Sequence, residues 1–420
     1  MRLLVQAGKL APGDVLPPVR GLAEQLEVNR NTVASAYRRL VTSGIAVALG
    51  RNGTVIRDQD HAGEQEGVSP GSSLRDLASG NPDPAWLPDP TAAWPAQRNA
   101  PRLYGQAVIN PGLEAACRPS LAIDCPGDFE FNLTHGAVDA IERLLSAHLV
   151  PGDKVILEAP CFLSSLNTMH AAGFEVVPAG VDAEGMRVDA LEAALEQGAR
   201  AVIVTPRAHN PTGYGFSARR AKKLVSVLAR YPQVLVIVDD HYAALSSTPY
   251  HSVIPKNAQR WALVRSVSKV LGPDLRLAFV ASDAHTSKRL RLRLAPGTNW
   301  VSHLLQDVVE RTLFGPEATA FIAEARDAYA RRRDLLVSAL AVEGIAVPER
   351  QDGLNIWIPL KAGNQQVAAE LAKRGWLVRG SDAFGVAPDG DGLRVTISTL
   401  QPDEATDFAR DLAAILSSLS

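Results

Sequence analysis

The chain has 420 residues, of which 46% are hydrophobic and 21% charged, and its formal net charge is −2. These proportions are ordinary for globular proteins and exclude a chain that is disordered over most of its length. No stretch approaches the roughly 20 apolar residues that cross a bilayer, and the N-terminus does not fit a signal peptide. The three cysteines lack metal-ligand spacing, so we expect no metal site and a reduced, cytoplasmic compartment.

Charge and composition divide the chain into three parts. Residues 1–58 carry eight Lys and Arg against four Asp and Glu, whereas residues 59–73 contain three acids, no Lys or Arg, and one Val. The second segment cannot bury a core, so it is expected to be a flexible linker. We therefore expect a small basic module over 1–58 and a body over 74–420, with any nucleic acid bound by the module.

The module is expected to begin with helices. Residues 2–7 fit the end of a first helix, and Pro17-Pro18 precedes a second helix. The spacing predicts that this second helix buries one face, made of Val19, Leu22, Ala23 and Leu26.

A third helix and a hairpin follow. Asn29 is a good N-cap, and Gly44 a good terminator, for a helix between them. Its expected apolar face consists of Val33, Ala36, Tyr37 and Leu40. Residues 45–58 alternate around a glycine-containing turn at 50–53, which predicts a two-stranded wing.

Two helices, a tight turn and a basic hairpin are typical of a winged helix-turn-helix, although a protein-interaction module fits the same pattern. Polar and basic side chains lie away from the apolar face, where they can reach base edges and phosphates in a major groove. The candidate DNA-binding residues are Arg20, Asn29, Arg30, Asn31, Thr32, Arg38 and, in the wing, Arg51.

The segment LAPGDVLPPVRGLAEQLEVNRNTVASAYRRLVTSGIAVALGRNGTVI closely resembles the DNA-binding domain of the GntR family of bacterial regulators. The resemblance implies binding to promoter DNA. Two features depart from the family: Pro18 replaces a usual Ser, and the first helix lacks its opening turns.

The body alternates short β-rich runs with helical patterns. The expected strands cover 155–159, 175–180, 201–206, 235–240, 262–268 and 276–282. Such alternation predicts an α/β fold with a mainly parallel sheet between helices. Functional side chains are then expected where strands end and helices begin.

Several residues at these strand ends suit a pyridoxal phosphate site. Lys269 follows an apolar run, where desolvation lowers the pKa of a lysine and favours Schiff-base chemistry. Asp239 ends another strand, and a protonated pyridine nitrogen would give its buried carboxylate a cationic partner. Ser266, Ser268 and Arg276 could hold a phosphate near the lysine.

The body resembles fold-type I pyridoxal-phosphate enzymes of the aspartate aminotransferase type, with a smaller C-terminal α/β subdomain. The matching motifs are HNPTG, the Asp-x-x-Tyr spacing and SVSKVLGPDLR. The resemblance implies that Lys269 forms an aldimine and that Asn210 and Tyr242 contact the cofactor oxygen. Related regulators often place the aromatic one position earlier, which is His241 here.

The same resemblance gives further roles. Gly136 and Ala137 would offer backbone N–H groups to the phosphate, and Phe162 would stack on the pyridine ring. Tyr104 would reach the phosphate of a partner subunit. On the substrate side, Arg394 would grip a carboxylate and Asn81 would belong to a closing segment.

A GntR-type head joined by a linker to an aminotransferase-like body resembles the MocR/GabR subfamily of transcriptional regulators. This implies a head-to-tail homodimer that senses pyridoxal 5′-phosphate, an amino-compound effector, or both, through Lys269. The alternative is an active aminotransferase with a vestigial head, favoured by Pro18, the shortened first helix and the complete catalytic set. A cofactor carrier or scaffold is a third, non-enzymatic interpretation. A transaminase half-reaction would be compatible with sensing.

Overall fold

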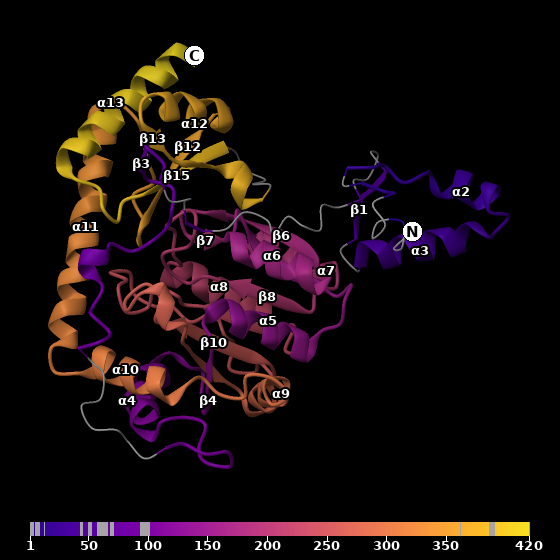
Figure 1. The fold of residues 1–420 in the computed structure, drawn as a ribbon, viewed down its shortest axis with the longest axis horizontal. Helices are drawn as coiled ribbons and strands as arrows, with labels where there is room; N and C mark the ends of the chain where they lie inside the picture. The colour runs from indigo at the N-terminus through magenta and orange to yellow at the C-terminus, as the bar shows by residue number, and fades with distance from the viewer. Residues whose placement is uncertain are drawn as a thin grey trace.

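The computed structural model describes residues 4, 9–11, 13–42, 45–48, 53–56, 66–67, 71–92, 101–361, 363–385 and 391–419. We call the described part up to Ile56 the head and the described part from residue 71 onward the body. Figure 1 shows the head as a small unit apart from the larger, layered body. The expected first helix, residues 2–7, lies outside the described residues except for Leu4, which is helical.

The head has the expected winged helix-turn-helix elements. Helices α2 (Val19–Gln25) and α3 (Arg30–Thr42) pack together, and strands β1 (Ala46–Ala48) and β2 (Thr54–Ile56) form an antiparallel pair. Asn29 caps α3 as expected, because its Oδ1 accepts a hydrogen bond of 2.8 Å from the N–H of Asn31. The wing tip, which includes Arg51, lies outside the described residues.

The core of the head is small. It contains Leu16, Leu22, Ala23, Val33, Tyr37, Leu40, Ile45, Ala46 and Ile56. Two predictions about this core are wrong: Ala36 is exposed, and Leu26 is 57% exposed. Leu26 is the C-cap of α2, one position beyond the last helical residue, and it is not part of the core of the head.

The body is built around an eight-stranded sheet in the order β4-β11-β10-β9-β8-β5-β6-β7. The strands are β4 (Glu130–Thr134), β5 (Lys154–Ala159), β6 (Glu175–Asp182), β7 (Gly185–Met186), β8 (Ala201–Val204), β9 (Leu235–Asp239), β10 (Trp261–Ser266) and β11 (Ala278–Ser282). Neighbours from β6 to β10 pair in parallel, while β11 and β7 run antiparallel to their neighbours. The predicted mainly parallel sheet is confirmed.

Helices cover both faces of this sheet, because alternate strand residues enter two different cores. In β9, Leu235 and Ile237 pack with α5 and α9, whereas Val236 and Val238 belong to the core that includes α7 and α8. The helices around the sheet are α4 (Pro111–Asp124), α5 (Ala137–His148), α6 (Leu163–Ala172), α7 (Val188–Glu196), α8 (Ala218–Leu228), α9 (Ala284–Leu294) and α10 (His303–Phe314).

A smaller C-terminal subdomain follows the long helix α11 (Ala318–Val342), as Figure 1 shows. Its antiparallel sheet has the order β12-β15-β14. Its elements are β12 (Asn355–Leu360), α12 (Asn364–Lys373), β13 (Trp376–Leu377), β14 (Arg379–Gly380), β15 (Asp391–Thr396) and α13 (Pro402–Leu419). The start of the body joins this subdomain, because β3 (Arg75–Asp76) pairs with β13.

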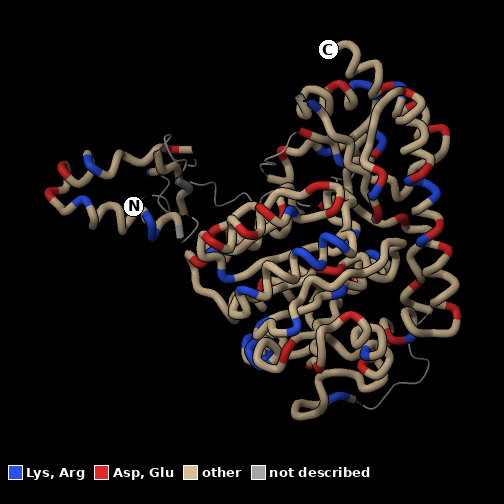
Figure 2. The backbone as a smooth tube through the Cα atoms, turned by 180° about the vertical axis from the view of Figure 1, so that it is seen from behind, with Lys and Arg blue, Asp and Glu red and all other residues tan. Residues whose placement is uncertain are grey.

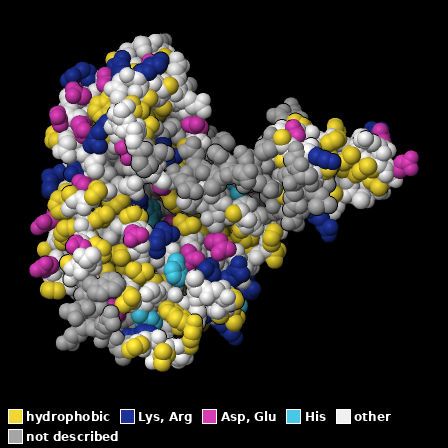
Figure 3. All heavy atoms as spheres, in the orientation of Figure 1, with side chains coloured by type: hydrophobic (Ala, Val, Ile, Leu, Met, Phe, Trp, Pro, Cys, Tyr) yellow, Lys and Arg dark blue, Asp and Glu magenta, His cyan; other side chains and the backbone are white. Residues whose placement is uncertain are grey.

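Charges on the body are mixed in sign over the face seen in Figure 3. Seen from behind, Lys and Arg gather on α9 (Figure 2), which contains Lys288, Arg289, Arg291 and Arg293. Among the described residues, no helix combines the length and the apolar character needed to cross a membrane.

Candidate cofactor site and DNA-binding surface

The strand register brings the expected phosphate-binding residues together where the ends of β4, β10 and β11 meet. Ser266, at the end of β10, lies opposite Ala278 of β11, which in turn lies opposite Thr134 of β4. The loop after β10 and the start of α5 therefore meet there. Ser266 and Ser268 face each other, with 3.0 Å between their hydroxyl oxygens.

The start of α5 has the geometry of an anion site. Gly136 is its N-cap, and no side chain among the described residues caps it. The Arg276 guanidinium lies against this turn: a Cβ added at Gly136 would be 3.1 Å from Nη2, and Nη2 donates to the carbonyl of His135 at 3.3 Å. Backbone N–H groups, the helix dipole and a cation thus converge beside the two serines, as a phosphate group requires.

Lys269 lies in the turn after β10, and its Nζ donates a hydrogen bond of 2.6 Å to the carbonyl oxygen of Gly80. Burial lowers the pKa of the Lys269 amine, and the nearby Arg394 cation lowers it further, against the raising effect of Glu66. This is the direction expected for a lysine that forms a Schiff base, because only the neutral amine is nucleophilic.

Asp239, the last residue of β9, is buried, and its Oδ1 has no hydrogen-bond partner among the described residues. Burial, with a smaller contribution from the neighbouring Asp240, raises its pKa to about 7. A second buried acid, Glu158, has a pKa raised to about 8 by burial. The free carboxylate oxygen of Asp239 fits a protonated ring nitrogen, and His241 lies near both Asp239 and the charge of Lys269. The residues present therefore fit pyridoxal phosphate.

The turn after β9 separates the two candidate aromatic residues. His241 Nδ1 lies 3.8 Å from Asp239 Oδ1, and burial together with the Lys269 charge lowers the pKa of His241 to about 4. Tyr242 instead belongs to the main core, and burial together with the Asp352 charge raises its pKa well above its usual value. The Tyr242 hydroxyl is buried and has no hydrogen-bond partner among the described residues, while His241 lies beside Asp239. Contact of Tyr242 or of His241 with the cofactor oxygen therefore stays a prediction.

Arg394, which the sequence predicts to lie on the substrate side, is already engaged by other groups of the chain. Arg394, on β15, is fully buried, and its Nη1 donates to Asn210 Oδ1 at 2.9 Å. The same guanidinium binds both carboxylate oxygens of Glu66, at 2.6 and 2.9 Å. Asn210 Nδ2 also donates to Glu66, at 2.9 Å. The large sheet, the C-terminal subdomain and the segment before β3 thus meet at one point.

Three other predicted site residues differ in where the fold places them. Asn81 is exposed and directly follows Gly80, whose carbonyl accepts from Lys269. Phe162 is the N-cap of α6, shortly after β5 ends, and is half-buried. Tyr104 is 91% exposed and touches Trp300 edge-on at 5.5 Å between ring centroids, so within this chain it does not reach the cofactor residues.

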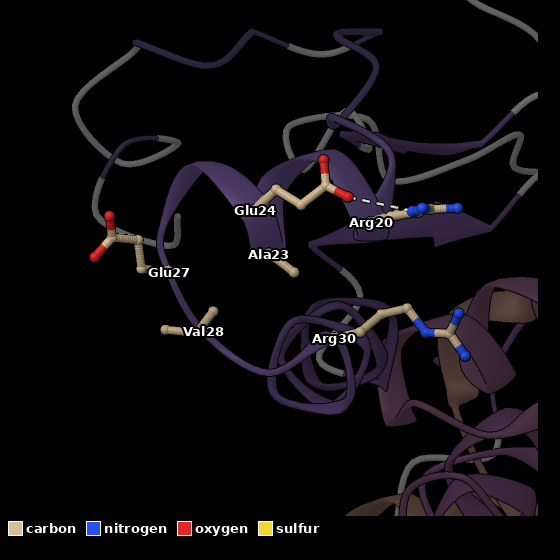
Figure 4. A pocket seen from close by; sticks show the side chains of 6 residues that line it. All are labelled: Arg20, Ala23, Glu24, Glu27, Val28 and Arg30. Atoms are coloured by element: carbon tan, nitrogen blue, oxygen red, sulfur yellow. Dashed lines mark hydrogen bonds and ion pairs between the residues drawn. The ribbon is translucent and has the colours of Figure 1, made fainter.

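The head presents its predicted DNA-binding residues to solvent. The described candidates are all exposed: Arg20, Asn29, Arg30, Asn31, Thr32 and Arg38. A shallow groove between α2 and α3 is lined by Arg20, Glu24, Glu27 and Arg30 (Figure 4), and Arg20 Nε donates to Glu24 at 3.2 Å. Figure 4 shows the Arg20 and Arg30 side chains pointing to the same side, away from Glu27.

Fold and site together define a class: a winged-helix DNA-binding head on a pyridoxal-phosphate aminotransferase-like body. The family model "Aminotransferase class I and II" matches residues 132–412, and "Bacterial regulatory proteins, gntR family" matches residues 1–56. The chain therefore belongs to the aminotransferase class I and II family, joined to a GntR head in the manner of the MocR/GabR transcriptional regulators. It is a DNA-binding regulator whose cofactor is pyridoxal 5′-phosphate.

Individual relatives agree with this assignment. The vitamin B6 salvage pathway transcriptional repressor PtsJ of Salmonella typhimurium is 53% identical over 98% of this chain and 96% of its own length. The HTH-type regulator YdcR of Escherichia coli is 26% identical over 88% of the chain and 87% of its own. The structure of kynurenine aminotransferase from Pyrococcus horikoshii, 24% identical, matches with a TM-score of 0.72 over 83% of this chain and 92% of its own, and supports the fold alone.

Sequence reasoning missed Glu66 and Gly80 as members of the site. Glu66 lies in the segment that composition assigns to a flexible linker, most of which is outside the described residues. Gly80 contributes a backbone carbonyl, which leaves no side-chain signal. The stretch SGNPDP around Gly80 was the available hint, and it pointed to the neighbouring Asn81.

Proposed function

We propose that this chain represses vitamin B6 salvage genes by binding their promoter DNA through its head and sensing pyridoxal phosphate through its body. The proposal rests on one observation: a single chain combines an exposed helix α3 in its head with a cofactor cradle in its body. This cradle consists of Lys269, the Asp239 oxygen that has no partner among the described residues, and the start of α5, which no described side chain caps. The similarity to PtsJ over nearly the whole chain supports the target genes and the sign of regulation.

Each residue of the cradle has a task that its surroundings explain. Bound pyridoxal phosphate supplies an aldehyde that reacts with amines and a ring that withdraws electrons. Lys269 offers an amine of lowered pKa, held by the Gly80 carbonyl. The free oxygen of Asp239 would accept the proton on the ring nitrogen. Ser266, Ser268, Arg276 and the N–H groups of Gly136 and Ala137 would hold the phosphate.

In the proposed regulation, two copies of the chain act together, and cofactor binding in the body changes DNA binding by the head. We infer a head-to-tail homodimer in the cytoplasm, with a DNA-binding domain over 1–58, a linker over 59–73 and a cofactor domain over 74–420. The exposure of Tyr104 supports a contact with the partner subunit. Two heads would then contact two half-sites of one operator.

The test is binding of the full-length protein to its own upstream DNA at several salt concentrations, with and without pyridoxal phosphate. We expect selective binding that weakens steeply with salt, as phosphate contacts require, and that changes on addition of the cofactor. In Lys269→Ala the cofactor should have no effect, whereas Lys288→Ala, an exposed lysine on α9, should behave as wild type. Salt-insensitive or absent binding would overturn the proposal.

An aminotransferase with a vestigial head is the competing candidate, favoured by the complete set of Lys269, Asp239 and Arg394. It predicts turnover of an amino acid with a keto acid, together with loss of selective DNA binding. The intact head core and the exposed arginines of α2 and α3 weigh against it.

A further inference from the structure

A carboxylate of the chain itself occupies the subsite where a carboxylate ligand would be held. Glu66 Oε1 and Oε2 form a two-pronged ion pair with Nη1 and Nη2 of Arg394, and Asn210 donates a third hydrogen bond. The Arg394 side chain is fully buried and that of Glu66 is 17% exposed. Breaking such a buried, two-pronged pair by removing one partner is costly, because the other charge is then left buried and unpaired.

The backbone beside Glu66 is tied to the body separately from its side chain. The Gly67 N–H donates to the carbonyl of Ser79 at 2.9 Å, and Arg379 Nη2 donates to the carbonyl of Gly67 at 2.9 Å. The carboxylate packs closely on Gly80, where an added Cβ would lie 2.5 Å from Glu66 Oε2. The side chain is therefore positioned by contacts on two sides.

The arginine has no terminal nitrogen left for a second carboxylate. Nη1 is shared between Glu66 and Asn210, and Nη2 between Glu66 and the carbonyl of Ala78. The face of the guanidinium is covered as well, because its carbon lies 4.9 Å from the centre of the Phe384 ring. An incoming carboxylate would have to displace Glu66 from the arginine. The two negative charges would also repel each other as it approached.

We propose that Glu66 is a specificity-determining residue that excludes carboxylate-bearing amines from the site. The protein then responds to the cofactor itself, or to an amine without a carboxylate, rather than to an amino acid. This inference rests on the proposed sensing of pyridoxal phosphate and deepens it. It also explains how a complete aminotransferase-like site can serve as a sensor, since the group that would position an amino acid is already neutralised.

The test uses full-length protein loaded with pyridoxal phosphate and two probes that differ by one carboxylate, L-alanine and ethylamine. Binding is followed through the absorption spectrum of the bound cofactor. We expect Glu66→Ala to bind L-alanine at least about tenfold more tightly than wild type, the range for a hydrogen-bonded charge, with ethylamine affinity unchanged. Glu64→Gln removes a charge two positions away in the sequence and should leave both affinities unchanged.

A second measurement does not require loaded protein. Maleate, a dicarboxylate without an amine, should raise the melting temperature of cofactor-free Glu66→Ala more than that of wild type, and the gain should vanish in Glu66→Ala/Arg394→Ala. Equal L-alanine affinity in wild type and Glu66→Ala, or an equal gain for ethylamine, overturns the inference. Failure of wild type to bind pyridoxal phosphate or DNA instead contradicts the proposed function.

Discussion

The head and the body assemble their functional surfaces in opposite ways. The described DNA-binding candidates lie between Arg20 and Arg38, on two adjoining helices, and all are exposed. The cofactor site draws on strands β4, β9, β10 and β15, and joins Glu66 to Arg394, 328 positions apart. A local surface depends on helix periodicity, whereas a distributed site depends on register and domain packing. The two parts should therefore fail separately when mutated.

The largest expected effect is on the cofactor. Asp239→Asn keeps the shape of the side chain but removes its charge, so the protonated ring nitrogen loses its partner. We expect pyridoxal phosphate affinity to fall by about a hundredfold, corresponding to roughly 3 kcal/mol for a broken buried charge pair. Spectroscopic titration of the cofactor measures this.

The matched control is Asp274→Asn, at an exposed position close to Arg276. It should bind the cofactor normally, and DNA binding by cofactor-free Asp239→Asn should equal that of wild type. If Asp239→Asn also weakened the binding of cofactor-free protein to DNA, head and body would not be separable in this way.

The next effect concerns the head alone. Arg30 is exposed at the start of α3 and points to the same side as Arg20 (Figure 4). Arg30→Ala should weaken operator binding by about tenfold, the loss typical of one arginine contact, without changing the cofactor spectrum. Glu27→Ala, on the other side of the groove, should not weaken binding in an electrophoretic or fluorescence assay. Equal loss in both variants would argue against this surface.

The pH dependence of the stability of the cofactor-free protein should depend on buried acids of the body. Burial raises the pKa of Asp239 to about 7 and that of Glu158 to about 8, whereas unfolded acids titrate near about 4. The fold thus keeps protons that the unfolded chain has lost, and its stability falls as the pH rises through this range. His209 and His241, whose pKa values burial lowers, act oppositely but below about pH 6.5.

Between about pH 6.5 and 8, Asp239→Asn should therefore lose about 1 kcal/mol less free energy of unfolding than wild type. Urea unfolding of cofactor-free protein at the two pH values measures the difference. Parallel behaviour of the two proteins would mean that Asp239 does not titrate in the folded protein over this pH range.

The smallest effect tests the small core of the head. The Tyr37 hydroxyl donates a hydrogen bond of 2.7 Å to the carbonyl of Pro17 and so ties α3 to the segment before α2. Tyr37→Phe should destabilise the head by about 0.5–1 kcal/mol. Hydrogen exchange should show faster opening of the head alone, with unchanged exchange in the large sheet. A uniform change across both parts would contradict the separation.

Much of this architecture follows from local patterns in the sequence. Apolar runs at strand spacing predict the large sheet, and the Asn29 cap and helical periodicity predict α3, because backbone hydrogen bonding and side-chain burial act over a few residues. The chemistry of Lys269 and Asp239 is also visible in the sequence, since Asp239 ends a buried strand and Lys269 lies in the turn after another. The exposure of Leu26 and of Ala36 could not be predicted from the sequence, because the width of the buried face of a helix depends on what packs beside it.

Only the tertiary structure decided which groups meet. The turn after β9 places His241 rather than Tyr242 toward Asp239, a choice that adjacent positions in a sequence do not reveal. The folding of the C-terminal subdomain onto the large sheet brings Arg394 to Asn210, and the segment before β3 brings Glu66 to both. Composition marks Glu66 as part of a polar linker. Its ion pair exists because a buried arginine needs a carboxylate, and the fold supplies one from the chain itself.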